Sequence, residues 1–126
     1  MLILWLAAMA AALWVIATFP AHAHDAMHPE LNKWYHDLMQ PDNPGMSCCG
    51  EADAYWCDDV HVVDGKTYCA ITDEREVTGR PHLDVGTRFE IPPNKIKTNQ
   101  GNPTGHEVIF LTTAGHVWCF VQGTRI

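Results

Sequence analysis

The apolar positions of the chain follow a helical period near residue 30. Four large apolar side chains between residues 28 and 41 recur at i, i+3, i+4 and i+7 and line one helix face: Leu31, Trp34, Tyr35 and Leu38. Pro29 suits the first turn of such a helix, and Pro41 prevents the helix from continuing. The pattern therefore predicts one amphipathic helix that ends before Pro41.

Beyond residue 55 the pattern changes to short apolar runs separated by turn residues, which is typical of β-strands. Asp64-Gly65 separates the runs 55–63 and 66–72 and predicts a two-residue hairpin, because both positions of a type I′ turn need a positive φ. The same pattern predicts further strands at 75–78, 87–91, 106–112 and 116–122. The expected fold is α+β, with one N-terminal helix followed by a small antiparallel, barrel-like sheet of five or six short strands, held by disulfides.

The first 23 residues are apolar almost throughout. The apolar run ends at Phe19, and Ala21 and Ala23 occupy the small-residue positions that a signal peptidase reads. We therefore predict a signal peptide at 1–23 and a single exported domain, periplasmic or extracellular, at 24–126. No Lys or Arg precedes the run, whose length approaches that of a membrane span. An uncleaved anchor that leaves the domain facing the periplasm is the alternative.

All five cysteines lie beyond this apolar segment, where an oxidising compartment favours disulfides. Cys48 and Cys49 are adjacent and cannot readily bond each other, so each is expected to reach a different partner. We predict Cys57 and Cys119 as these two partners, in either order, which leaves Cys69 over. The spacing fits neither the paired C-x₂-C units of zinc ribbons nor a C-x-x-C redox pair.

The chain carries 15 acidic and 8 basic side chains and a net charge of −7. An acidic chain without a basic cluster repels phosphate backbones, which argues against nucleic acid as a partner. Membrane contact is expected only if residues 1–20 remain as an anchor. No phosphate-binding loop or nucleophile motif is present, so we predict no catalytic residue and no cofactor, and an enzyme is the less favoured class. A binding or structural module of the cell envelope is favoured, with an unknown protein, glycan or small molecule as its ligand.

Several segments together resemble a group of small exported alphaproteobacterial proteins of unknown function. The resembling segments are His24-Asp25, Trp34-Tyr35, Ser47-Cys48-Cys49 with Cys57, Ile91-Pro92-Pro93, Asn102-Pro103-Thr104-Gly105-His106 and Val117-Trp118-Cys119-Phe120-Val121. The resemblance implies export and a common disulfide-tied fold, and it implies no activity. This sequence departs from the group in having the helix between His24-Asp25 and Trp34-Tyr35, and in the additional Cys69.

The mature N-terminus suggests a copper-binding protein as the alternative function. If cleavage follows Ala23, His24 presents a free α-amino group beside an imidazole, a pair that suits the tetragonal nitrogen coordination of Cu(II). A further nitrogen would come from another histidine: His28, His36, His106 or His116. The competing explanation is that a first-residue histidine merely marks where the signal ends.

A second candidate site is an aromatic and acidic surface beside the vicinal cysteines. Its members are Trp34, Tyr35, Glu51, Asp53, Tyr55 and Trp56. Exposed aromatic rings with nearby carboxylates could bind a glycan or a peptide. Small domains usually place such rings in the core, and that alternative stays open.

Overall fold

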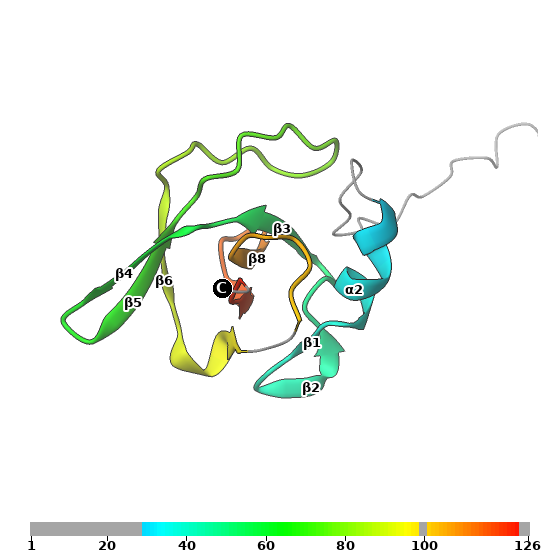
Figure 1. Cartoon of the computed structure of the whole chain (residues 1–126), viewed down its shortest axis with the longest axis horizontal. Coiled ribbons are helices and arrows are strands. Elements are labelled where there is room, and N and C mark those ends of the chain that lie inside the picture. Colours follow the sequence, from blue (N-terminus) through cyan, green and yellow to red (C-terminus); the bar gives the residue numbers. More distant parts are fainter. Residues whose placement is uncertain (1–28, 99–100, 124–126) are drawn as a thin grey trace, which may run out of the picture.

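The computed structural model describes residues 29–98 and 101–123. Its elements are η2 Pro29–Leu31, α2 Asn32–Asp37, β1 Met39–Gln40, β2 Asn43–Ser47, β3 Ala52–Trp56, β4 Asp59–Val63, β5 Lys66–Ala70, β6 Arg88–Ile91, η3 Pro93–Lys95, β7 Ile96–Lys97, β8 Val108–Thr112 and β9 Val117–Val121. The strands form three sheets of order β1-β2, β3-β8-β9-β7 and β4-β5-β6 (Figure 1).

The α+β expectation and the predominance of antiparallel pairing are confirmed. The barrel and the number of strands were wrong, since the described residues form nine strands and no closed barrel.

The four-stranded sheet is the centre of the fold because both of its faces are buried. Along β8, Val108 and Phe110 face one core cluster, whereas Ile109 and Leu111 face the other. This division follows from the strand period of two, which points successive side chains to opposite faces. All four side chains are nearly inaccessible to solvent, which explains why the apolar run 108–111 is continuous.

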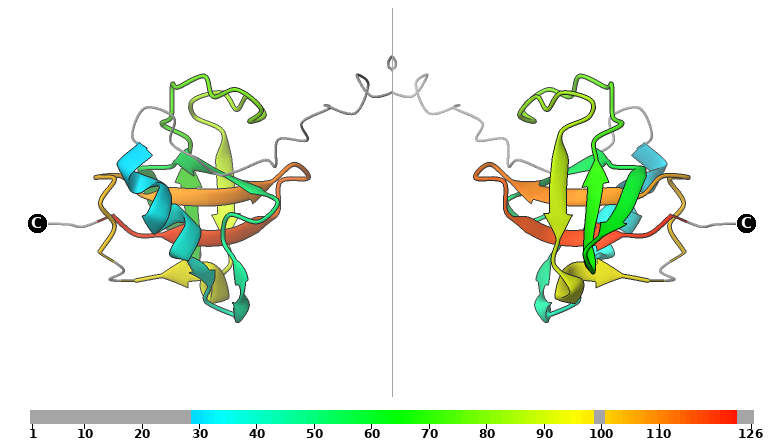
Figure 2. Two further views of the ribbon diagram at one scale, coloured as in Figure 1. Left: turned by 90° about the vertical axis from the view of Figure 1, so that its right-hand side faces the viewer. Right: turned by 90° about the vertical axis from the view of Figure 1, so that its left-hand side faces the viewer.

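One face of the central sheet is covered by α2 and the segment that follows it. The short helix lies across β8 and β9 (Figure 2, left). Tyr35 and Leu38 from the helical face are buried there, and the Tyr35 ring meets the Phe110 ring edge-on at 6.1 Å between centroids. The predicted helix is therefore confirmed, although its α-helical part spans only six residues.

The three-stranded sheet covers the opposite face (Figure 2, right). Cys69, Ile71 and Ile91 from this side pack against Ile109 and Phe120 of the central sheet. The second core is therefore made between two sheets, and the first between a sheet and a helix.

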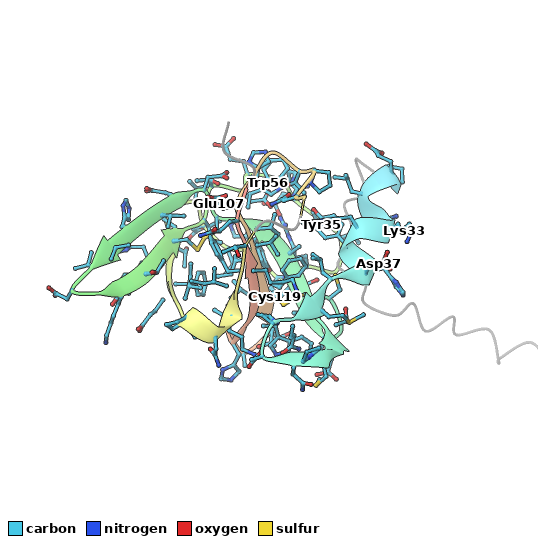
Figure 3. All side chains as sticks on the ribbon, turned by 60° about the horizontal axis from the view of Figure 1, so that its bottom comes forward. Lys33, Tyr35, Asp37, Trp56, Glu107 and Cys119 are labelled. Atoms are coloured by element: carbon cyan, nitrogen blue, oxygen red, sulfur yellow. A yellow bond between two sulfur atoms is a disulfide. The ribbon has the colours of Figure 1, made fainter. Side chains whose placement is uncertain are left out.

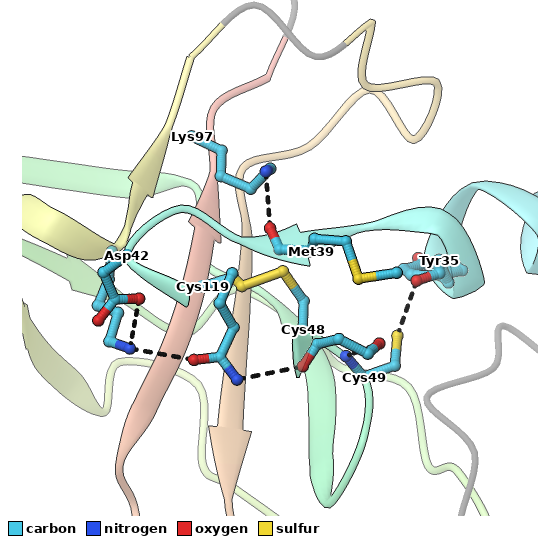
Figure 4. Close-up of a disulfide and its surroundings, with 10 residues drawn as sticks. Tyr35, Met39, Asp42, Cys48, Cys49, Lys97 and Cys119 are labelled. Atoms are coloured by element: carbon cyan, nitrogen blue, oxygen red, sulfur yellow. Dashed lines mark hydrogen bonds and ion pairs between the residues drawn. A yellow bond between two sulfur atoms is a disulfide. The ribbon is translucent and has the colours of Figure 1, made fainter. Parts of the chain in front are cut away.

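One disulfide links each of the two covering layers, the helical segment and the three-stranded sheet, to the rest of the chain. Cys48 bonds Cys119 of β9 on the helical side (Figure 4), and Cys57 at the end of β3 bonds Cys69 of β5 on the other side. The predicted bond from the vicinal pair to Cys119 is confirmed. The predicted bond from the pair to Cys57 was wrong, and Cys69 is not the cysteine left over, because Cys57 and Cys49 lie on different faces of the central sheet.

The hairpin at Asp64-Gly65 is confirmed. Asp64 has φ 52° and Gly65 has φ 77°, and β4 and β5 pair in register on either side of them. The run 55–63, however, is not one strand: β3 belongs to the central sheet and β4 to the covering sheet. The chain crosses between the two layers at the cysteine that follows β3.

Of the other predicted strands, three are confirmed and one was wrong. Those at 87–91, 106–112 and 116–122 are present as β6, β8 and β9 with shorter bounds. The strand predicted at 75–78 was wrong, because this stretch belongs to a loop that packs around a buried carboxylate, as described below. The short strands β1, β2 and β7 were not predicted.

Residues 1–23, with the predicted signal peptide or anchor, lie outside the described residues, and no described helix is long and apolar enough to cross a membrane.

Candidate functional site

The six residues of the predicted aromatic and acidic surface do not form one exposed surface. Tyr35 and Tyr55 are 2% and 3% exposed and belong to the two different core clusters. Trp34 and Trp56 are half-buried against the first cluster, Asp53 is half-buried, and of the six only Glu51 is exposed. The strand period of β3 explains the separation, since Tyr55 and Trp56 must point to opposite faces. The six residues are therefore not gathered into one platform, and the four rings pack in or against the core clusters, which is the alternative that the sequence left open.

The predicted copper ligands are not brought together in the described part of the chain. His24 and His28 lie outside the described residues. His36 is exposed on α2, where its Nδ1 lies 3.3 Å from the carboxylate of Asp37. Within residues 29–98 and 101–123, no group of three His, Cys, Asp or Glu side chains is arranged to hold a metal ion. Copper binding through His24 stays a prediction.

A buried carboxylate organises the loop between β5 and β6. The Asp73 side chain is fully buried and accepts hydrogen bonds from the Arg75 guanidinium at 2.8 and 3.0 Å and from Arg80 Nη1 at 3.0 Å. The backbone N–H groups of Arg75 and Trp56 donate to it as well. Burial alone would raise the pKa of Asp73, but the hydrogen bonds from the two arginines outweigh burial and lower the pKa well below its usual range.

The same arginines stack on the two aromatic residues of β3. The Arg80 guanidinium lies 4.4 Å from the Tyr55 ring centroid, and that of Arg75 lies 3.6 Å from the Trp56 ring centroid. The Tyr55 hydroxyl also donates to the Pro81 carbonyl at 2.6 Å. These contacts fasten the loop onto the edge of the central sheet, and we name this arrangement the Asp73 clamp.

The other side of Trp56 is occupied by an imidazole. The His106 ring is stacked on Trp56 at 3.8 Å between centroids and 9° between planes, so it and Arg75 must lie on opposite faces of the indole. Asp58 orients the imidazole, since its Oδ2 lies 2.8 Å from His106 Nδ1 and its Oδ1 accepts the Glu107 N–H. Figure 3 shows Trp56 beside Glu107 at one end of the molecule. The groups around the indole bond mainly to one another, which favours a structural role.

Cys49 keeps its thiol beside the Cys48–Cys119 disulfide. Its Sγ lies 3.1 Å from the Tyr35 carbonyl oxygen, to which it donates (Figure 4). Burial, with a smaller contribution from the negative charge of Asp53, raises the pKa of Cys49 to about 12. The thiol is therefore protonated at neutral pH and poorly reactive. The expectation that each vicinal cysteine reaches a disulfide partner was wrong.

The outer face of the three-stranded sheet presents an open hollow of about 390 Å³. It is lined by Val63, Tyr68, Arg88 and Glu90, one residue from β4, one from β5 and two from β6. The strand register explains this grouping, because Tyr68 pairs with Glu90 directly and has Arg88 as a diagonal neighbour. The sequence analysis did not single out these residues. The alternation along 66–70 and 88–91 could have placed them on one face, but not shown that this face is uncovered.

Arg88 differs from the two arginines of the Asp73 clamp. Its guanidinium lies 5.1 Å from the Tyr68 ring centroid, and no acidic side chain of the described residues forms an ion pair with it. On the same face, Lys66 Nζ lies 3.9 Å from the Glu90 carboxylate. The hollow therefore combines an apolar side chain, an aromatic ring, the Glu90 carboxylate that faces Lys66, and the Arg88 guanidinium, whose N–H donors are open to a ligand.

Comparisons with known proteins add no relative to these observations. No family model, curated protein or solved structure matches the chain. The functional proposal therefore rests on the geometry of the chain itself.

Proposed function

We propose that the protein is an exported, disulfide-stapled binding module that recognises its partner with the outer face of β4, β5 and β6. The observation that carries this proposal is the open hollow around Tyr68 and Arg88. The two disulfides support an oxidising compartment as its place of action. The Asp73 clamp and the two cores support a rigid scaffold, on which a preformed surface binds at a reduced ordering cost.

The chemistry of the hollow supports a ligand with an apolar group beside a carboxylate. Val63 is 46% exposed and Tyr68 is half-buried, so both offer apolar area to a ligand. Arg88 presents a planar fork of donors that matches the two oxygens of a carboxylate. A peptide that ends in an apolar residue with a free α-carboxylate carries both features.

The test is a calorimetric titration with a matched pair of peptides, acetyl-Val-Leu as the free acid and as the C-terminal amide. We expect the acid to bind about tenfold more tightly than the amide, because a charge-assisted bidentate contact contributes about 1.5 kcal/mol or more. Arg88→Gln should abolish this difference. Tyr68→Ala should weaken both peptides, because it removes the apolar contact that they share.

Lys33→Gln is the matched control, since it also removes one positive charge from an exposed position, on α2. It should leave the preference for the acid unchanged. Equal affinities of the acid and the amide for the unmodified protein would contradict the proposal. The same conclusion follows if Lys33→Gln reduces the preference as much as Arg88→Gln does, because the preference would then reflect net charge alone.

A further inference from the structure

We infer that β4 is a self-pairing edge, through which two copies of this chain join their three-stranded sheets into one six-stranded sheet. In the described residues β4 pairs only with β5, so its other edge is open. The hairpin of β4 and β5 projects away from the central sheet (Figure 1). This inference concerns the edge of the sheet and does not depend on the ligand proposed for its outer face.

The hairpin geometry fixes which backbone groups point to the open edge. A two-residue turn makes Val63 and Lys66 a hydrogen-bonded pair, and such pairs recur at every second residue of an antiparallel ladder. Val60 and Val62 lie between these pairs. Their N–H and C=O groups therefore point away from β5, toward the open edge.

The positions of these groups are self-complementary. A two-fold axis at His61 places Val60 of one copy opposite Val62 of the other, and Val62 opposite Val60. Each such pair can exchange both of its N–H···O=C bonds, so every outward-pointing group of Val60 and Val62 finds a partner. A symmetric interface of this kind closes as a dimer and leaves no further edge of β4 for growth.

The side chains of the edge favour the same pairing. Val62 is 69% exposed on the sheet face that elsewhere packs against the core, and the two-fold arrangement covers it with Val60 of the second copy. On the other face, Asp59 Oδ1 lies 3.0 Å from His61 Nε2, and the axis sets His61 of each copy diagonal to Asp59 of the other. The axis also sets the two His61 side chains opposite each other, so each imidazole has an Asp59 carboxylate of both copies as a neighbouring hydrogen-bond acceptor.

Natural proteins usually protect an open edge with lysine, proline or a bulge. Residues 59–63 contain neither lysine nor proline, and β4 pairs with β5 in unbroken register. Three of the five residues are valine, which favours extended strands. The edge therefore retains the features that promote strand pairing.

The test is analytical ultracentrifugation of the protein over a wide concentration range. We expect the weight-average mass to rise from monomer toward dimer with concentration. Val62→Pro removes an N–H that points to the open edge and spares the ladder with β5, so it should raise the dissociation constant about tenfold or more. Val62→Lys should weaken pairing as well, by placing a charge in the valine contact. Val85→Lys is the matched control, because Val85 is 56% exposed outside the strands, and it should dimerise like the unmodified protein.

Amide hydrogen exchange of the unmodified protein tests the interface at single residues, and it does not require that any variant fold correctly. The amides of Val60 and Val62 should become protected as the concentration rises, whereas the amide of Val85 should not change. A protein that stays monomeric at every concentration overturns the inference. So does a dimer whose Val60 and Val62 amides exchange as fast as in the monomer, or one that Val62→Pro and Val62→Lys leave intact.

Discussion

The Asp73 clamp should contribute more to stability than any exposed ion pair of the chain. Asp73→Asn removes a negative charge that faces two guanidinium groups, whose side chains are only 19% and 7% exposed in Arg75 and Arg80. It also presents an amide N–H₂ to donors that need an acceptor. Breaking a buried ion pair by removing one partner costs about 3–5 kcal/mol.

We expect Asp73→Asn to lower the free energy of unfolding by an amount at the lower end of this range. The reason is that Arg80 still donates to two backbone carbonyls, those of Ala54 at 2.8 Å and of Arg75 at 2.6 Å. A loss of about 3 kcal/mol corresponds to a fall in Tm of about 12–24 °C for a domain of this size. Urea denaturation followed by tryptophan fluorescence measures the change in free energy of unfolding. Urea is preferable to guanidinium chloride, which screens the ion pair.

Asp37→Asn is the control for this prediction. Asp37 pairs with Lys33 at 2.6 Å, but both side chains are more than half exposed, and such pairs contribute about 0.5 kcal/mol or less. If Asp73→Asn costs no more than Asp37→Asn, the reasoning on the buried carboxylate is refuted.

The same carboxylate predicts a dependence on pH. The folded protein holds the pKa of Asp73 below the ordinary value of an aspartate, so ionised Asp73 stabilises the fold fully above about pH 5. This stabilisation is lost as the pH falls below about 4, toward the depressed pKa of the folded state. The difference in free energy of unfolding between the unmodified protein and Asp73→Asn should therefore shrink on acidification. A difference that stays constant down to pH 3 contradicts this account of Asp73.

Further substitutions test other parts of the fold. Replacing Cys57 and Cys69 together by alanine should lower the free energy of unfolding by about 2.8 kcal/mol, and replacing Cys48 and Cys119 together should lower it by about 4.4 kcal/mol, because the second disulfide closes a longer loop. Equal losses of the two double variants in urea denaturation contradict the chain-entropy reasoning. Gly50→Ala places a Cβ 2.8 Å from the Trp118 ring and should cost about 1–3 kcal/mol, and an unchanged melting curve contradicts the close packing. For the copper alternative, titration of the processed protein with Cu(II) should give a saturable visible absorption band that His24→Ala removes, and equal binding by the variant contradicts it.

Local chemistry made some features of this fold predictable. The turn at Asp64-Gly65 needs only two residues that tolerate positive φ, and the structure forms it as expected. The run 108–111 is apolar at every position because both faces of β8 are buried. A bond from the vicinal pair to Cys119 followed from the apolar strand that carries Cys119, whereas the sequence left open whether Cys48 or Cys49 makes it.

Features that depend on distant parts of the chain were not predictable in the same way. The two residues of β7 pair in parallel with β9, and no periodicity is visible in so short a strand. The strand predicted at 75–78 is a loop because Arg75 bonds the buried carboxylate of Asp73. The pairing of Cys57 depends on which face of the central sheet the chain leaves after β3, and spacing alone does not show this.

The candidate site illustrates the same limit. Aromatic and acidic residues close in sequence, such as Tyr55 and Trp56, suggested a joint surface, but strand alternation separates them. The hollow instead gathers Tyr68 and Arg88, which are far apart in sequence and meet only through the register of β5 and β6. The amino-acid composition does not indicate that Tyr68 and Arg88 lie next to each other in the fold.

The most direct test of the proposed binding surface is a nuclear magnetic resonance titration of the ¹⁵N-labelled protein with acetyl-Val-Leu free acid. We predict saturable shifts of the amides of Val63, Tyr68, Arg88 and Glu90, and their loss in Arg88→Gln. Shifts confined to residues 51–56 and the helix, with β5 and β6 unchanged, would contradict the proposal.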